Sequence, residues 1–268
     1  MKTLFYFIAI CPLFANGLTS VAGDEFSATA TQQEIILKAG GKTFTISKND
    51  SEECIKIDGK GGITPVYRYK ADKKTVFLKG VSLKESRPAK EEGGRKTVEL
   101  VFQEEENFKL ELSLSVEKGL PILFVKASLK NAGSSPQGEV SFEWFDNRKF
   151  DGYIGQNMQK REMPATTGTD YTLGMASKTG WSTIGTSRKD RWVYLLRGNN
   201  SDETLGIIIQ GAISEHGGFG IREDRFVYWA EMIGALEEGS ALVSSFALVP
   251  GKSFDDFKNI LSQRDFSK

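Results

Sequence analysis

The fold of this chain is set by the stretch Phe108-Lys109-Leu110-Glu111-Leu112-Ser113-Leu114-Ser115-Val116. Apolar side chains occupy every second position, and lysine, glutamate and serine occupy the positions between them. Successive side chains of a strand point to opposite faces, so this period of two predicts a strand with one buried and one solvated face. Strands of this kind are typical of antiparallel sheets that have one wet side.

The same period recurs on both sides of this strand. The nearest neighbours, 97–102, 122–129 and 139–145, are separated by short polar breaks and are expected to be consecutive meander strands of the same sheet. Upstream, Ala39-Gly40-Gly41 predicts a hairpin turn between two alternating runs. The remaining expected strands are 34–38, 42–48, 54–58, 66–69, 75–78, 191–197, 205–210, 226–232 and 241–248.

Three segments differ from this pattern. Residues 146–190 are punctuated by glycines and are expected to be a long irregular, functional segment, whereas the charged stretch 84–96 is expected to be an exposed loop. After Ser253, a helix N-cap residue, acidic residues and an apolar stripe predict a short helix that closes the sheet. The sequence therefore predicts an all-β fold: a large antiparallel two-sheet β-sandwich with a short C-terminal helix.

The N-terminus has the order of a secretory signal peptide. Lys2 precedes an apolar run from Leu4 to Phe14, and Ser20-Val21-Ala22 fits a small-residue cleavage site. An uncleaved membrane anchor is the alternative, but the run is short of the ~20 residues that span a bilayer. A lipid attachment at Cys11 is disfavoured by the Pro12 that follows it. We expect residues 1–22 to be the signal peptide, residues 23–268 to be one β-sandwich domain, and the protein to be secreted or periplasmic.

Composition narrows the partners of the mature chain. The sequence has 35 basic and 35 acidic residues, and removal of Lys2 leaves a net charge of −1, which favours neither nucleic acid nor an anionic membrane surface. Further apolar segments of membrane-spanning length are not found in the sequence. Cleavage would leave Cys54 as the one cysteine, so the fold depends on its core and not on an internal disulfide. The oligomeric state is not determined by these features.

Two further segments resemble a known family. The turn Leu129-Lys130-Asn131-Ala132-Gly133, after the strand Val125-Lys126-Ala127-Ser128, is similar to the strand and N-x-G turn of galactose-mutarotase-like β-supersandwich domains. The closing Ser245–Gly251 and its final helix are similar to the end of such domains. The resemblance implies a carbohydrate-related function: either sugar epimerisation, or the role of a sugar-contacting domain in a polysaccharide-processing enzyme. Its epimerising members use a histidine acid, a glutamate base and usually a second histidine.

His216 is the single histidine of the chain, so a two-histidine site is excluded. We expect His216 to act as a general acid or base with a carboxylate such as Glu231; the alternative is an exposed histidine in a loop. Aromatic rings stack on sugars, and charged groups bind their hydroxyls. The candidate substrate-binding residues are therefore Trp144, Tyr153, Trp181, Trp229 and the polar contact Arg222. Core packing is an equally good interpretation of Trp229.

Other site chemistries have weaker support. Asp146, Asn147 and Asp151 are closely spaced oxygen ligands that could hold Ca²⁺, but they match no calcium-loop pattern, so we predict no metal and no cofactor. A nucleophile-elbow motif, a phosphate loop and zinc-ligand clusters are not found in the sequence. The leading hypothesis is an exported protein that binds or processes a carbohydrate. The alternatives are a non-enzymatic envelope or interaction protein of the same fold, and an extracellular polysaccharide hydrolase or lyase.

We expect the exported protein to begin near Gly23, because signal peptides are cut after small residues. Intact-mass measurement of protein recovered outside the cytoplasm should show the loss of residues 1–22. Replacing Ala22 by arginine should leave the longer chain uncleaved. A full-length mass for the exported wild-type protein would contradict the prediction.

Overall fold

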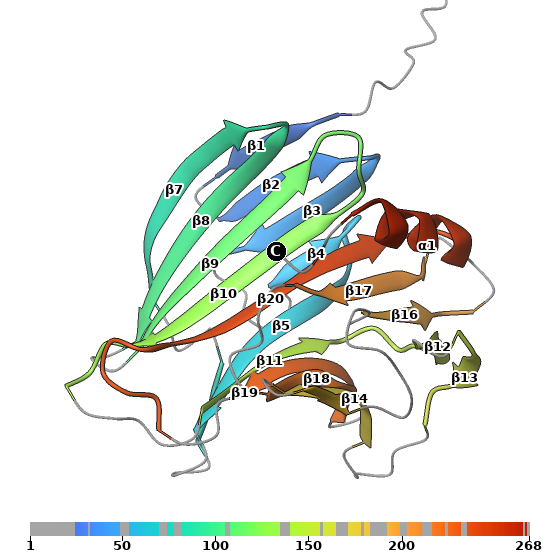
Figure 1. Cartoon of the computed structure of the whole chain (residues 1–268). Coiled ribbons are helices and arrows are strands. Elements are labelled where there is room, and N and C mark those ends of the chain that lie inside the picture. Colours follow the sequence, from blue (N-terminus) through green and yellow to red (C-terminus); the bar gives the residue numbers. More distant parts are fainter. Residues whose placement is uncertain are drawn as a thin grey trace, which may run out of the picture.

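The computed structural model describes residues 25–31, 33–48, 54–69, 74–77, 82–104, 108–134, 140–155, 158–164, 171–177, 180–182, 192–198, 203–210, 216–222, 225–231, 235–264 and 266. The predicted signal peptide, with Cys11, lies outside these residues. Within the described part of the chain, strands form two large antiparallel sheets, and a single helix lies at one end of them (Figure 1). This confirms the predicted two-sheet β-sandwich.

The smaller sheet, called sheet B here, is built around the strand that carries the perfect alternation. In the described residues its order is β13-β12-β16-β17-β20-β10-β9-β8-β7. Its strands are β7 (Ser82–Glu92), β8 (Arg95–Glu104), β9 (Phe108–Glu117), β10 (Leu123–Asn131), β12 (Gly152–Ile154), β13 (Lys160–Glu162), β16 (Trp192–Leu196), β17 (Leu205–Ile209) and β20 (Ala241–Pro250).

The larger sheet, called sheet A here, has the order β1-β2-β3-β4-β5-β11-β19-β18-β14-β15 in the described residues, and β6 pairs with β5. Its strands are β1 (Ser27–Ala30), β2 (Glu34–Ala39), β3 (Lys42–Ser47), β4 (Ile55–Ile57), β5 (Lys60–Tyr69), β6 (Lys74–Phe77), β11 (Val140–Asp146), β14 (Tyr171–Ser177), β15 (Gly180–Ser182), β18 (His216–Arg222) and β19 (Arg225–Glu231). The predicted hairpin at Gly40-Gly41 joins β2 to β3, and both glycines have positive φ.

The core lies between the two sheets. The apolar side of β9, from Phe108 to Val116, is fully buried, and it belongs to one cluster with the inward residues of β2, β3 and β11. Trp144 of β11 packs edge-on against Phe246 of β20 at 5.1 Å between ring centroids, so aromatic contacts join the sheets directly. Cys54, which begins the expected strand 54–58, is buried in this core.

The C-terminal helix α1 (Phe254–Gln263) confirms the prediction made from its cap and its apolar stripe. The Ser253 hydroxyl accepts a hydrogen bond from the Asp256 backbone N–H at 3.1 Å, which caps the first turn. Phe257 is fully buried on the outer side of sheet B, where it packs against Trp192 and Tyr194. The helix therefore covers part of the sheet B face that looks away from sheet A. No helix in the described residues is both long and apolar enough to cross a membrane.

The charged stretch 84–96 is not the exposed loop that we expected. It forms most of edge strand β7, which turns at Gly93-Gly94 into β8. Charged side chains and Pro88 are compatible with an edge position because one side of an edge strand needs no hydrogen-bonded partner. Two register shifts, between Leu83 and Glu85 and between Arg87 and Lys90, also interrupt its pairing.

The meander prediction is correct for β8, β9 and β10 but wrong for β11. β11 crosses to sheet A, where it pairs with β5 and β19, and β20 takes the position beside β10. Alternation identifies the buried face of a strand but does not say which of two sheets the strand joins.

Further strands were not expected from the sequence: β1, β18 and the strands β12, β13, β14 and β15, which all lie inside the segment expected to be irregular. β18 contains Gly217, Gly218 and Gly220. Glycine is depleted in strands, so local preference does not favour β18. Its pairing on both sides, with β14 and β19, supplies the stability that its composition lacks.

The N-x-G turn at the end of β10 is held by the side chain of Asn131. Its Oδ1 accepts a hydrogen bond from the Gly133 N–H at 3.0 Å, and its Nδ2 donates to the Leu236 carbonyl at 2.8 Å. Asn131 is buried, so these bonds satisfy an amide that would otherwise be costly to bury.

Gly206 of β17 lets the helix approach sheet B. A Cβ at this position would overlap the ring of Phe257, so Gly206→Ala should lower the free energy of unfolding by about 1–3 kcal/mol. Denaturant unfolding measures this change. Gly155→Ala is the matched control, because its added Cβ would meet only Tyr153 at 4.0 Å. Equal losses in the two variants would refute the packing argument.

Candidate functional site on the outer face of sheet A

Strand β11 presents different chemistry to the two sides of sheet A. Phe142 and Trp144 face the core between the sheets, and Glu143 and Phe145 alternate with them and lie on the other side, called the outer face of sheet A here. This division follows from the alternation of side chains along the expected strand 139–145. Glu143 is only 1% exposed, so the outer face carries a buried carboxylate.

The Glu143 carboxylate forms an ion pair with Arg222, the last residue of β18. The guanidinium carbon of Arg222 also lies over the ring of Trp229, 4.6 Å from its centroid. Trp229 of β19 is directly opposite Glu143 in the ladder. A buried carboxylate, a guanidinium and an indole from three adjacent strands thus meet on this face.

A second arginine lies on an aromatic residue close by. The guanidinium carbon of Arg225 is 4.4 Å from the ring centroid of Phe145, and its Nη1 donates to Asn147 Oδ1 at 3.3 Å. Phe145, Val227 and Trp229 form a small buried cluster that is separate from the main core. The outer face therefore has an apolar base crossed by two arginines.

The strand register brings together the two residues predicted to be catalytic. His216 is opposite Glu231 across β18 and β19, and the same row continues to Ser177 on one side and to Ser141 on the other. Residues directly opposite in an antiparallel ladder have Cβ atoms about 4.5–5.5 Å apart. His216 is the first residue of a strand, not a loop residue, and its position is compatible with the predicted acid–base pair.

Trp144 and Trp229, which were both proposed as sugar platforms, lie on opposite sides of sheet A. Trp144 is 2% exposed between the sheets, and its Nε1 has no hydrogen-bond partner among the described residues. Trp229 is equally buried and has Arg222 over its ring. The two rings do not converge on one cleft, so we leave Trp144 out of the proposed site.

The other two proposed platforms lie elsewhere. Tyr153 is buried in sheet B, where it belongs to the main core cluster. Trp181 lies on β15, opposite Ala176, at the end of sheet A. Tyr153 is therefore on the other sheet from His216 and Glu231, whereas the strand of Trp181 is separated from that of His216 by β14 alone.

The three candidate calcium ligands are engaged by the protein itself. Asp146 is buried and forms two side-chain bonds with Arg148, at 2.9 and 2.5 Å. Asn147 accepts the bond from Arg225, and Asp151 Oδ2 accepts one from the Gly198 N–H at 2.5 Å. Among the described residues, no group of three or more histidine, cysteine, aspartate or glutamate side chains is arranged to hold a metal ion.

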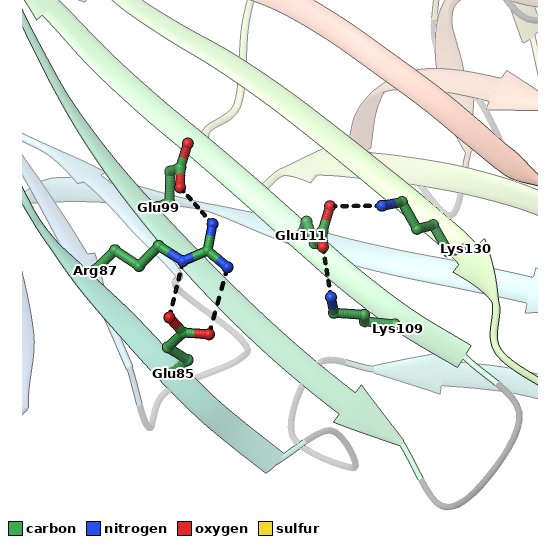
Figure 2. A network of polar contacts seen from close by, with 6 residues as sticks. All are labelled: Glu85, Arg87, Glu99, Lys109, Glu111 and Lys130. Carbon is green, nitrogen blue, oxygen red and sulfur yellow. Dashed lines mark hydrogen bonds and ion pairs between the residues drawn. The ribbon is translucent and has the colours of Figure 1, made fainter. Parts of the chain in front are cut away.

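The outer face of sheet B is also charged, but its charges pair with one another. Figure 2 shows Arg87 bonded to Glu85 and Glu99, and beside them Glu111 bonded to Lys109 and Lys130. The Arg87 guanidinium lowers the pKa of the Glu85 carboxyl, and Lys109 and Lys130 lower that of Glu111. Exposed pairs of this kind contribute little stability and are typical of a solvated face.

An open depression of about 450 Å³ lies at one end of this charged face, near the β7–β8 turn. It is lined by Lys90, Glu92, Gly93, Arg95, Thr97, Glu99 and Glu117. Glu99 is paired with Arg87, and Glu117 is paired with Arg95 at 3.5 Å and with Arg264. Because these acids are already paired, the depression is a weaker candidate site than the outer face of sheet A.

Sequence reasoning missed the role of Glu143. Alternation along the expected strand places Glu143 on one face with Phe145, but its partner Arg222 is 79 positions away in the chain. The sequence does contain one signal for this role. Glu143 is the one charged residue of the stretch 140–145, and its neighbours Phe142, Trp144 and Phe145 are aromatic. A carboxylate in such surroundings needs a cation.

Comparisons with solved structures agree with the architecture. The chain is similar to a GH36 α-galactosidase of Geobacillus stearothermophilus in complex with raffinose (TM-score 0.59, 10% identity, 88% of this chain and 44% of that chain). It is also similar to the galactosidase domain of an α-galactosidase–sucrose kinase (TM-score 0.54, 8% identity, 83% and 41%). A third structure is an α-N-acetylgalactosaminidase of Bifidobacterium bifidum (TM-score 0.50, 12% identity, 89% and 39%).

At these identities the likeness shows the fold alone, and the chain spans less than half the length of these enzymes. It agrees with the large two-sheet β-sandwich fold that the resemblance implied. No protein-family profile matches the sequence, and no curated protein sequence matches it.

The ion pair between Glu117 and Arg264 ties the end of α1 to sheet B and has a pH signature. Arg264 and, less strongly, Arg95 hold the pKa of the Glu117 carboxyl below its usual range. A lowered pKa stabilises the folded protein above the ordinary glutamate value of 4.5, and this contribution is lost as the pH falls through the folded pKa. Glu117→Gln should therefore cost up to about 1 kcal/mol at pH 7 and nothing in strong acid.

Denaturant unfolding at several pH values tests this dependence. Glu162→Gln is the control, because Glu162 is exposed on edge strand β13. A loss in Glu117→Gln that stays constant down to strong acid would contradict the assignment.

Proposed function

We propose that this protein is an exported carbohydrate-interacting β-sandwich whose ligand binds to the outer face of sheet A, over β11, β19 and β18. The observation that carries the proposal is the register that places His216 opposite Glu231. The cluster of Glu143, Arg222 and Trp229 lies on the same three strands. The core of a β-sandwich does not need a buried carboxylate such as Glu143, because burying a charged group costs free energy unless the group is paired.

Sugar recognition fits the chemistry of this face. Hydroxyl groups both donate and accept hydrogen bonds, so carboxylates, an imidazole and guanidinium groups are suitable partners. The similar structures support this class of ligand: one is described in complex with raffinose and another in complex with stachyose. The chain matches less than half of each of these enzymes, so their reactions are not carried over.

A catalytic role is the second candidate, and it is favoured by the His216–Glu231 register alone. A histidine beside a glutamate suits transfer of one proton to a sugar and removal of another. The resemblance to epimerising enzymes points the same way, although those enzymes use a second histidine that this chain lacks. A non-enzymatic envelope or interaction protein of the same fold remains the interpretation if no sugar binds.

Export is part of the proposal. The signal-like residues 1–22 support a location of the mature domain outside the cytoplasm, where oligosaccharides and polysaccharides are available ligands. Without an internal disulfide, the domain must persist there through its packing.

We expect the mature protein to bind raffinose, stachyose or another galactoside, and Glu231→Gln and His216→Asn to weaken that binding roughly tenfold each. Isothermal titration calorimetry with the purified protein measures the affinity, after a thermal-shift screen of oligosaccharides has selected the best ligand. NMR tests for catalysis by following either the conversion of one sugar anomer into the other or the cleavage of a glycosidic bond.

Glu111→Gln is the matched control, since Glu111 is on the solvated face of sheet B. It should bind the ligand like the wild-type protein. Absence of binding across the whole sugar panel would refute the proposal. Equal losses in Glu111→Gln and Glu231→Gln would refute the location.

A further inference from the structure

The ion pair on the outer face of sheet A spans two strand spacings. Arg222 is on β18 and Glu143 on β11, and β19 lies between them. Neighbouring strands are about 4.8 Å apart, so the long arginine side chain must lie across the face to reach the carboxylate. Gly218 and Gly220, which alternate with the inward-facing Phe219 and Ile221, leave no side chain on β18 along its path.

The exposure of Glu143, Arg222 and Trp229 determines which of these three side chains a ligand can contact. Glu143 is 1% exposed and Trp229 is 2% exposed, whereas the Arg222 side chain is 25% exposed. The guanidinium lies 4.6 Å from the centroid of the indole ring and covers that face of it. Arg222 is therefore the member of the cluster that a ligand can reach, and the indole ring is the surface that supports its guanidinium.

The geometry points to Glu143 as a positioning residue that fixes Arg222 over the Trp229 ring, so that the face presents immobilised N–H donors to an uncharged glycan. This inference rests on the proposed function and adds a ligand class to it. A guanidinium carries five donors in a rigid fork, and holding it in place reduces the entropy lost on binding.

The charge of the pair selects the ligand. The Glu143 carboxylate already compensates the charge of Arg222. A uronate or sulfate brought to the same guanidinium would meet the carboxylate as a like charge in a poorly solvated site. Hydroxyl oxygens accept hydrogen bonds without this repulsion, so neutral sugars are preferred.

Calorimetry with a neutral and an acidic probe, raffinose and trigalacturonate, tests the inference. The wild-type protein should bind raffinose more tightly than trigalacturonate. Glu143→Gln should weaken raffinose binding roughly tenfold or more, because Arg222 loses its anchor, and it should reduce the preference against trigalacturonate. Glu117→Gln is the matched control, since it removes a carboxylate of sheet B from Arg264 at the end of α1, and it should change neither affinity.

A second variant distinguishes the loss of the Arg222 donors from misfolding of the protein. Arg222→Met with Glu143→Gln removes both charges and keeps an aliphatic side chain over Trp229, so it should unfold near the wild-type temperature and still lose raffinose binding. In the unliganded protein, the Arg222 side-chain N–H signals should exchange slowly with water in the wild type and rapidly in Glu143→Gln.

The outcomes separate the two proposals. If the wild type binds raffinose and Glu143→Gln binds it equally well, the positioning role is overturned while the carbohydrate function stands. Tighter wild-type binding of trigalacturonate overturns the ligand class. If no sugar binds the wild type, the proposed function fails together with this inference.

Discussion

The structure depends on one constraint: each long strand must bury one side against the other sheet. β9 satisfies it most fully, with every apolar residue from Phe108 to Val116 in the core and the polar residues between them on the outer side. The apolar layer between the sheets is built by repeating this arrangement. Hydrophobic burial of this kind is the main favourable term in folding, and here it replaces the disulfides found in many small exported domains.

Burial between the sheets leaves the two outer faces available for other uses, and they differ. The outer face of sheet B carries exposed acid–base networks around Arg87 and Glu111 (Figure 2), together with a helix that covers an aromatic cluster. The outer face of sheet A carries a buried carboxylate, arginines laid on aromatic rings, and the His216–Glu231 register. Charge on the first face is solvated, whereas the Glu143 carboxylate on the second is buried and paired with Arg222, and buried ionisable groups mark candidate functional sites.

Local periodicity predicted much of the fold but little of the site. The strand β9, the β2–β3 hairpin and helix α1 follow from alternation, glycine turns and a serine cap. β7 was missed because an edge strand tolerates charges and proline, and β18 because its glycines hide a strand that is stabilised by its neighbours. The partition of Glu143 and Trp144 to opposite faces was predictable, but the identity of the inward face was not. The Glu143–Arg222 contact joins distant strands, and short-range patterns carry no information about it.

The crossing of β11 into sheet A has a consequence for the order of assembly. Phe145 pairs with Thr64 and with Val227, which are each about eighty residues away along the chain, whereas β8, β9 and β10 join through short turns. Local contacts form before distant ones because less chain entropy is lost in closing short loops. Until β19 docks, β11 has an open edge, and Trp229 and Arg222 are not beside Glu143. The proposed ligand-binding face therefore exists only in the fully assembled protein, and occupancy by a ligand would report that folding is complete.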